Sequence, residues 1–385
     1  MISLAVATLL FAAAEPALSD RILESPIRVE RLANGARLMA VHLPAAKTVS
    51  AQLFISSEGL APQIDKAGAR HMLEHLVVAA NENLDAELES QGAFLTAATY
   101  RDVVRFEIVA AESQGVYAAT KLFGLLQRRA FSEHDVKRER VTLQQELSLT
   151  APERKERESA WFTAYGETRP DPAGIVEGME KVTPEILSGL WTWLTEGSRV
   201  TLVVAGNLNA ERTLESLRPK FQTLEPSRDI PFGDISPFEA KVSRSSAFVA
   251  GKIDEWGTPS HAARLATGLA LGNLDSRVRI HYTPSAREGL VTLTFPDAEA
   301  WRSAKEFITS LTLVAPDQAK RTAKQWYDRL MKNPSGCAYL HGMLVTPTTE
   351  VRPSAFESAL QKVTPEVLQA EYDRWMSAEP GKVMP

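Results

Sequence analysis

The sequence contains very little cysteine, since Cys337 is the only one in 385 residues. A single thiol cannot form an internal disulfide, and it leaves no thiolate cluster for a cysteine-based metal site. A lone cysteine of this kind is more often a small buried hydrophobic residue than a nucleophile. Stability must therefore come from a core, and a hydrophobic content of 44% excludes disorder as the dominant state.

Excess positive charge and long apolar runs are also missing. The 43 Lys and Arg side chains are outnumbered by 48 Asp and Glu, which gives a net charge of −5. Without a basic field to hold phosphate groups, nucleic acid is not expected as a partner. The apolar stretch at residues 2–14 is too short to span a bilayer, so no stable membrane span is expected.

The same N-terminal stretch resembles a secretory signal. It is uncharged, and Ala17-Leu18-Ser19 before Asp20 forms a small-x-small cleavage site. No Lys or Arg precedes it, so an N-terminal core strand or helix is the alternative. We interpret residues 1–19 as a signal peptide, which predicts a periplasmic or secreted protein.

A repeated segment divides the rest of the chain, whose length allows two or three domains. Lys-Val-Thr-Pro-Glu-Ile-Leu begins at Lys181, and a near copy begins at Lys362, 181 residues later. In each copy Thr is placed as an N-cap and Pro takes the first helical position, so each copy opens a helix. The spacing indicates a tandem duplication. We predict an N-terminal metal-binding domain, a linker and a C-terminal domain at residues 20–225, 226–246 and 247–385.

The motif His71-x-x-Glu74-His75 in a predicted helix is the strongest chemical signal. The histidines are four residues apart, so both imidazoles project from one helix face and can reach one Zn²⁺. Glu74 can reach a water beside the metal without binding the metal. This order of residues is that of the inverzincins. Two structural histidines on a core helix are the alternative interpretation.

A third ligand is expected on the helix predicted at residues 133–147, after the capping residue Ser132. Glu139 and Glu146 lie two turns apart on this helix and share one face. A carboxylate pair could be ordinary solvated surface, but a zinc site requires a partner acid. Glu153 and Glu156 are further candidates, although they lie past this helix.

These residues resemble the M16 peptidases, the inverzincin family of insulinase and mitochondrial processing peptidase. Segments similar to family motifs lie at residues 34–37, 68–75, 139–146 and 203–207, and Pro172, Gly174 and Gly178 fall at family positions. The resemblance implies an α+β fold of the M16 and LuxS-like type, with two homologous sheet-plus-helices domains in tandem related by pseudo-twofold symmetry. It also implies one Zn²⁺ per chain, with Glu74 as general base, Glu139 supporting the site, and three ligands: His71, His75 and Glu146.

The expected substrate-binding positions depart from the family pattern. Thr96-Ala97-Ala98-Thr99 replaces Asn-Ala-x-Thr, so peptides should dock there by pairing with the strand backbone. In the second half, which has no metal motif, Arg277 resembles a substrate-binding arginine, but Thr292 stands where the family has Tyr. The only nearby tyrosine is Tyr282, which the sequence does not place. These departures predict a homodimer or heterodimer with another M16-like chain.

The sequence therefore predicts a zinc-dependent endopeptidase that hydrolyses peptides or unfolded segments in a chamber between two domains. The alternative is a non-catalytic or partner-dependent M16-like subunit that binds peptides or supports a homologous subunit. The intact metal motif favours the first prediction. The changes at Thr96 and Thr292 favour the second.

Overall fold

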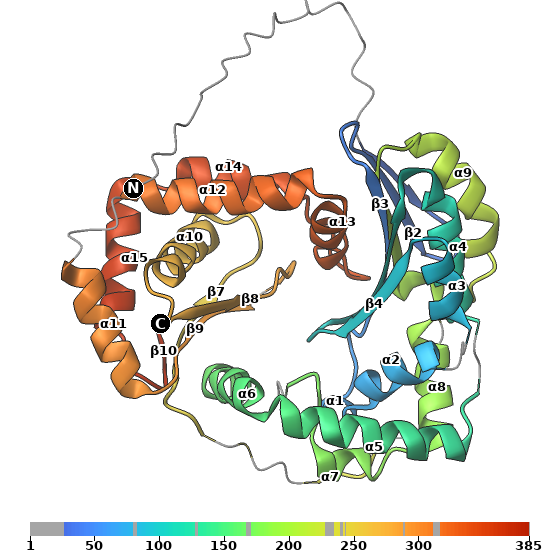
Figure 1. Ribbon diagram of the computed structural model, residues 1–385, viewed down its shortest axis with the longest axis horizontal. Helices are drawn as coiled ribbons and strands as arrows, with labels where there is room; N and C mark the ends of the chain where they lie inside the picture. The colour runs from blue at the N-terminus through green and yellow to red at the C-terminus, as the bar shows by residue number, and fades with distance from the viewer. Residues whose placement is uncertain are drawn as a thin grey trace, which may run out of the picture.

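The computed structural model describes residues 27–79, 83–127, 130–166, 171–227, 235–238, 242, 244–287, 289–310 and 316–384. The predicted signal peptide lies outside the described residues, as does part of the predicted linker at 226–246. The described chain forms two lobes, each a sheet with helices packed on it (Figure 1). The domain boundaries given above stay a prediction.

A six-stranded sheet organises the first half. Its strand order is β1-β2-β6-β3-β5-β4, antiparallel except for the parallel pair β2 and β6. β4 lies at an edge, so one side of it is unpaired within the described chain. The strands are β1 (Ile27–Arg31), β2 (Arg37–His42), β3 (Thr48–Ser56), β4 (Phe94–Thr99), β5 (Val103–Ala111) and β6 (Val200–Gly206).

The helices of the first half form around residues that cap and bury them. Ser132 accepts a hydrogen bond from the Asp135 amide at 3.1 Å, and Thr183 accepts one from the Ile186 amide at 3.4 Å, as their N-cap patterns predict. The α-helices are α1 (Pro62–Lys66), α2 (Ala69–Ala79), α3 (Leu84–Ser90), α4 (Gly115–Leu125), α5 (Glu133–Leu149), α6 (Ala151–Tyr165), α7 (Val176–Met179), α8 (Pro184–Leu194) and α9 (Ala210–Phe221). The described part of this half also includes the 3₁₀ turns η1 (Glu112–Gln114) and η3 (Gly197–Arg199).

The second half is built on a smaller sheet with the order β10-β7-β9-β8. Its strands are β7 (Phe248–Ile253), β8 (Arg279–Tyr282), β9 (Gly289–Thr294) and β10 (Lys382–Met384). Its helices are α10 (Pro259–Leu274), α11 (Ala298–Ser310), α12 (Pro316–Lys332), α13 (Pro334–Met343), α14 (Ser354–Lys362) and α15 (Pro365–Ser377). In chain order these elements repeat the first half from β3 to β6, and Thr364 caps α15 as Thr183 caps α8. Counterparts of β1, β2 and α9 do not occur among the described residues.

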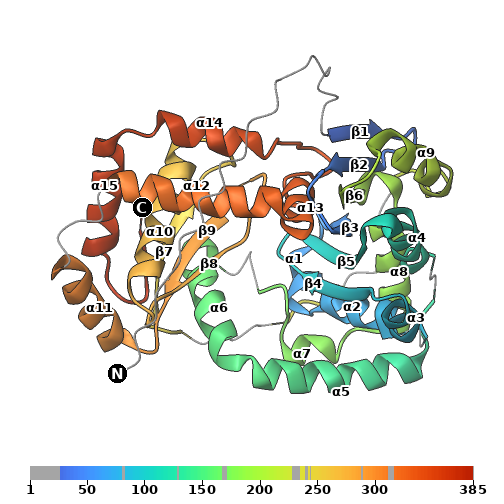
Figure 2. The ribbon, with the colours of Figure 1, turned by 45° about the horizontal axis from the view of Figure 1, so that its top comes forward.

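Each half contributes one helix to the sheet of the other half. α13 packs on β3 and β6, where Cys337 and Ala338 join a buried cluster with Phe54. α6 packs on β7, β9 and β10, where Ala160 is buried against Phe248. Figures 1 and 2 show α13 beside the first sheet and α6 beside the second. The two helices occupy equivalent places in chain order, as a pseudo-twofold relation of the halves requires.

A buried polar contact fixes α13 on the first sheet. The Gln52 side-chain amide on β3 donates to the Ser335 carbonyl oxygen at 2.7 Å and to the Glu107 carboxylate at 2.9 Å. Ser50 donates to the same carboxylate oxygen at 2.8 Å. Because buried polar groups must be paired, this contact fixes how the second half sits on the first.

One expectation from the sequence is met in this fold. Cys337 is fully buried, and burial raises the pKa of its thiol to about 12, which makes it an inert core residue. Within the described residues, no helix combines the length and apolar character needed to cross a bilayer.

Candidate metal centre

The helix α2 carries His71, Glu74 and His75 of the predicted site on one side, and its other side packs in the core. Met72, Leu73 and Leu76 belong to the main core of the first half. His71 and Glu74 keep 7% and 8% of their surface exposed, and both line one cavity. The rings of His71 and His75 lie with their centroids 5.0 Å apart.

Glu146 of α5 lies opposite both imidazoles. Its Oε1 is 3.6 Å from His71 Nε2, and its Oε2 is 3.3 Å from His75 Nε2. In a tetrahedral zinc site with bonds of about 2.1 Å, neighbouring ligand atoms are about 3.4 Å apart. The ligand atoms of the three residues all lie within 4.8 Å of one another. This donor set therefore fits a single Zn²⁺ with a further coordination position left for water or substrate.

The second nitrogen of each imidazole is held by an oxygen. His71 Nδ1 lies 3.2 Å from the Ala173 carbonyl oxygen, and His75 Nδ1 lies 3.5 Å from Glu139 Oε2. Metal-binding histidines commonly have such a partner, which fixes the tautomer and the ring orientation. Glu139 is itself buried and accepts a hydrogen bond from Arg138 Nε at 3.0 Å. The arrangement places Glu139 behind His75 and Glu146 between the two rings.

Glu74 differs from the other carboxylates of the site in its surroundings. Its Oε2 accepts a hydrogen bond of 2.6 Å from the Thr99 hydroxyl at the end of β4. Burial raises the pKa of Glu74, while the Thr99 hydrogen bond and the two imidazoles act in the opposite direction. For Glu146 the hydrogen bond with His75 lowers the pKa. The surroundings thus shift the pKa of Glu74 upward and that of Glu146 downward.

The loop after α6 contacts the start of α2 through two glycines, Gly174 in the loop and Gly68 just before the helix. Gly68 and Gly174 both have positive φ, and a Cβ on Gly174 would lie 2.3 Å from the Gly68 Cα. This close approach lets Ile175 donate to the Lys66 carbonyl at 3.1 Å and brings the Ala173 carbonyl to His71. Gly178 packs as closely, since its Cβ would lie 2.6 Å from the Ala67 Cα. Backbone contact explains why glycine occupies these positions.

Substitution Gly174→Ala should weaken zinc binding about 10–100-fold, the range expected when the partner of a liganding histidine is lost. The added methyl group must push the loop away from Gly68 and carry the Ala173 carbonyl away from His71. A competition titration with a metal chelator measures the change. Gly59→Ala is the matched control, because Gly59 has a φ of +84° against +80° at Gly174 but has nothing within 4 Å of the added atom. Equal affinities in the two variants would show that the loop does not orient His71.

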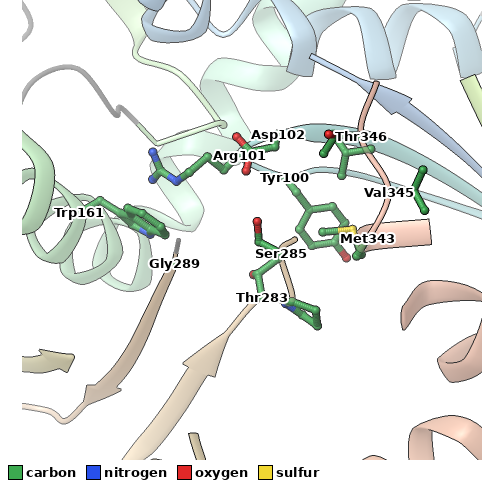
Figure 3. Close-up of a pocket in the computed structure, with 12 residues that line it drawn as sticks. Tyr100, Arg101, Asp102, Trp161, Thr283, Ser285, Gly289, Met343, Val345 and Thr346 are labelled. Atoms are coloured by element: carbon green, nitrogen blue, oxygen red, sulfur yellow. The ribbon is translucent and has the colours of Figure 1, made fainter. Parts of the chain in front are cut away.

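A cavity of about 400 Å³ opens in front of the metal centre. Ala97, Ala98 and Thr99 of β4 form one side, Arg157 and Trp161 of α6 form another, and Thr283 comes from the second half. An adjoining pocket shares four of its lining residues, Tyr100, Arg101, Trp161 and Thr283 (Figure 3). The site therefore faces a space bounded by both halves of the chain.

The predicted substrate-binding residues lie at different distances from this cavity. Ala97 lines it, while Thr96 lies on the same edge strand but is not among the lining residues. Arg277 is not a lining residue either; it is exposed and forms an ion pair of 2.5 Å with Asp275. Thr292 is buried in β9, and the Tyr282 hydroxyl lies 3.0 Å from His261 Nε2. The substrate roles predicted for Thr96 and Arg277 stay predictions.

Three features of the site were not predicted from the sequence. These are the Thr99 hydrogen bond to Glu74, the loop at residues 171–174 behind His71, and the side chains of α6 in the cavity. The Pro-x-Gly sequence at residues 172–174 was the only signal for the loop, and nothing in the local pattern of α6 marks Arg157 as facing the metal centre.

The fold and the His-His-Glu cluster define a class of protein, a two-domain α+β protein with a candidate metal centre in its first half. Residues 37–163 match the sequence model of the insulinase family, Peptidase family M16. The match with a protein described as the beta subunit of mitochondrial-processing peptidase in Arabidopsis thaliana is 25% identical over 218 residues, 53% of this chain and 40% of that one. With the beta subunit from Saccharomyces cerevisiae it is 20% over 275 residues, 65% and 59% of the two chains.

Solved structures resemble nearly the whole chain. A protease from Helicobacter pylori has a TM-score of 0.69 at 14% identity, covering 90% of this chain and 95% of that one. A protein described as an M16-like peptidase from Alicyclobacillus acidocaldarius has a TM-score of 0.66 at 17% identity, covering 91% and 96%. The periplasmic protease PqqL from Escherichia coli has a TM-score of 0.62 at 14% identity, covering 91% and 46%. At these identities the likeness shows the fold.

These matches confirm that the chain is related to the M16 peptidases and has their two-domain fold. The sequence match lies in the half that carries the candidate metal centre. The family match supports a peptidase function, and the His71, His75 and Glu146 group could hold a metal ion. The chain matches less than two thirds of the length of the two curated relatives.

Proposed function

We propose that the protein is a zinc-dependent endopeptidase that cleaves peptides or unfolded segments in the space between its two halves. The observation that carries this proposal is the convergence of two histidine Nε2 atoms on Glu146 with Glu74 beside them. Each histidine also has its Nδ1 held by an oxygen, which a structural histidine pair does not need.

In the proposed reaction, Glu74, Thr99 and Glu139 have separate roles. Bound zinc would supply a Lewis acid that polarises the scissile carbonyl and makes water more acidic. Glu74 accepts the proton of the attacking water and later delivers it to the leaving amine. Thr99 holds Oε2 of Glu74, so Oε1 is the oxygen left for proton transfer. Glu139 fixes the orientation of His75 through its Nδ1.

The edge strand β4 is the proposed docking place for substrate. An extended peptide can add to an unpaired strand edge through backbone hydrogen bonds, which do not depend on the substrate's side chains. β4 ends at Thr99, next to Glu74, so a peptide lying along β4 would be led to the catalytic carboxylate. α6 bounds the opposite side of the cavity, and a space of about 400 Å³ admits an extended segment but not a folded domain. Substrates are therefore peptides or unfolded segments.

A peptide-library digest with and without a chelator tests the proposal. We expect cleavage by the zinc-loaded protein, its loss when zinc is removed and its return when zinc is added back. The purified protein should contain one zinc ion per chain. Cleavage that persists at the same rate in the metal-free protein would contradict the proposed mechanism.

A second candidate function is that of a subunit active only with a homologous chain. It is favoured by the second half, where Thr292 is buried, Arg277 pairs with Asp275, and no counterparts of β1 and β2 occur among the described residues. Running the same digest with the chain alone and with another M16-like chain separates the two candidates. Because the N-terminus predicts export and PqqL is a periplasmic protease, a periplasmic partner is the first choice.

A further inference from the structure

Arg157 is a cationic side chain in the same cavity as the candidate metal centre. It lies on α6 and lines the cavity together with His71, Glu74 and Glu146. Its side chain is 38% exposed, so it remains accessible to a molecule that enters the cavity. The proposed mechanism gives it no role in proton transfer or metal binding.

The only ion-pair partner of Arg157 in the described part of the chain is Asp171. The distance from Arg157 Nε to Asp171 Oδ2 is 3.8 Å, which is too long for a hydrogen bond. Asp171 is almost fully buried, and its Oδ1 accepts a hydrogen bond of 2.9 Å from the Ala173 amide. Asp171 therefore anchors the guanidinium group by charge, while the N–H donors of that group stay available to a ligand.

A second arginine and an aromatic ring line the same cavity as Arg157, which also contains the carboxylates Glu74, Glu146 and Asp171. One helical turn further on, Trp161 lines the same cavity, and the Arg101 guanidinium lies 3.4 Å from the centre of its ring. Figure 3 shows Arg101 and Trp161 side by side among the residues that line the adjoining pocket. On β8 of the second half, burial and then the charge of Arg157 lower the pKa of His281. The charge of Arg279 acts in the same direction and that of Glu153 in the opposite one, so Arg157 lies close enough to the second half to act on His281.

We propose that Arg157 binds a carboxylate of the peptide substrate close to the scissile bond and so determines which peptides are cleaved. The proposal rests on the proposed peptidase function. A guanidinium fork can hold a carboxylate through two parallel N–H···O hydrogen bonds, and such charge-assisted bonds are stronger than neutral ones. The carboxylate could belong to an Asp or Glu side chain or to the C-terminus of a short peptide. In either case the carboxylate of the peptide would bind Arg157 of α6 while the peptide backbone pairs with β4.

Matched peptides measure this preference directly. In one series Glu is exchanged for Gln at each position around a cleaved bond, and in another the C-terminal acid is exchanged for the amide. We expect the wild-type protein to cleave the carboxylate form with a kcat/KM about 10–100-fold higher in one of the series, as expected for a charge-assisted hydrogen bond. The series that shows the effect identifies the source of the carboxylate.

Variants at Arg157 then test whether this residue is responsible. Arg157→Gln should lose the preference, measured within that variant as the ratio of kcat/KM for the acidic peptide to kcat/KM for the neutral peptide. Arg157→Lys should keep a weaker preference, because it retains the charge without the fork. Arg302→Gln is the control, since Arg302 is an exposed arginine on α11 that pairs with Glu299 at 2.9 Å. It should behave as the wild type.

The outcomes separate this proposal from the proposed function. Equal cleavage of the acidic and neutral peptides by the wild-type protein in both series would overturn the role of Arg157, even if Arg157→Gln failed to fold. An unchanged preference in Arg157→Gln would overturn it as well. Failure to cleave any peptide in a zinc-dependent manner, alone or with another M16-like chain, would instead refute the peptidase function itself.

Discussion

Glu74→Gln should abolish peptide hydrolysis and leave zinc binding intact. Glutamine has the shape of glutamate, and its carbonyl oxygen can still accept the Thr99 hydrogen bond. It cannot accept the proton of water, so kcat/KM should fall by about 10²–10⁴-fold, the range for loss of a positioned general base. Glu74 is not among the His71, His75 and Glu146 ligand atoms, so the zinc content should stay at one per chain. Steady-state kinetics and metal analysis on the same preparation measure both effects.

Glu299→Gln is the matched control for this experiment. Glu299 is 74% exposed on α11, where it forms a surface ion pair with Arg302. The control removes one negative charge as Glu74→Gln does, but far from the cavity, so its kcat/KM should stay unchanged. Wild-type turnover in Glu74→Gln would exclude Glu74 as the base. Loss of zinc in that variant would mean that Glu74 acts on the metal.

The candidate metal-binding helix α2 could be predicted from the sequence because its pattern depends only on residues close together in the chain. The spacing of His71 and His75 fixes their common face in any α-helix, and Ser132 predicts where α5 begins. The same local rule places Glu139 and Glu146 on one face of α5. Which of the two carboxylates faces the Nε2 atoms depends on how α5 packs against α2. From the sequence, Glu146 could be predicted as the ligand only through the resemblance to a family.

The remaining parts of the site depend on contacts between segments distant in sequence. The Ala173 carbonyl reaches His71 because two glycines at residues 68 and 174 touch, and no local pattern links them. Arg157 and Trp161 enter the cavity because α6 crosses to the second sheet, which is a property of how the halves exchange helices. Periodicity predicts the exposed and buried faces of such a helix but not which sheet it will cover.

The second half shows how an expectation from the sequence was refined by the structure. The repeat at Lys362 predicts the helix α15, and α15 is present with its Thr364 cap. The closing strand β10 is only three residues long and pairs parallel with β7, whereas β6 pairs antiparallel with β3. Tyr282, which the sequence could not place, contacts His261 inside the second half. Among the described residues of this half, Thr283 lines the cavity, while α13 packs on the first sheet.

Glu146→Ala should weaken zinc binding more strongly than Glu139→Ala. Glu146 faces the Nε2 atoms of both imidazoles at 3.6 and 3.3 Å, so its loss removes one of the three protein ligands. Glu139 faces only Nδ1 of His75 at 3.5 Å, so its loss should cost about 10–100-fold in affinity, as for other partners behind a ligand. We expect Glu146→Ala to lose more than this and to be inactive, while Glu139→Ala regains much of its activity at saturating zinc.

A competition titration with a metal chelator measures these affinities. It also tests the remaining candidate ligands, Glu153 and Glu156. Glu153→Ala and Glu156→Ala should bind zinc as the wild type does, because the described structure groups neither residue with the histidines. If Glu139→Ala proved the weaker binder and Glu146→Ala kept stoichiometric zinc, Glu139 would be the ligand, and α5 would have to turn relative to α2 when the metal binds. Leu143 and Leu147 of α5 are buried in the core of the first half, so such a turn would disrupt their packing. The rigid packing of α5 is thus the physical reason to expect Glu146 as the third ligand.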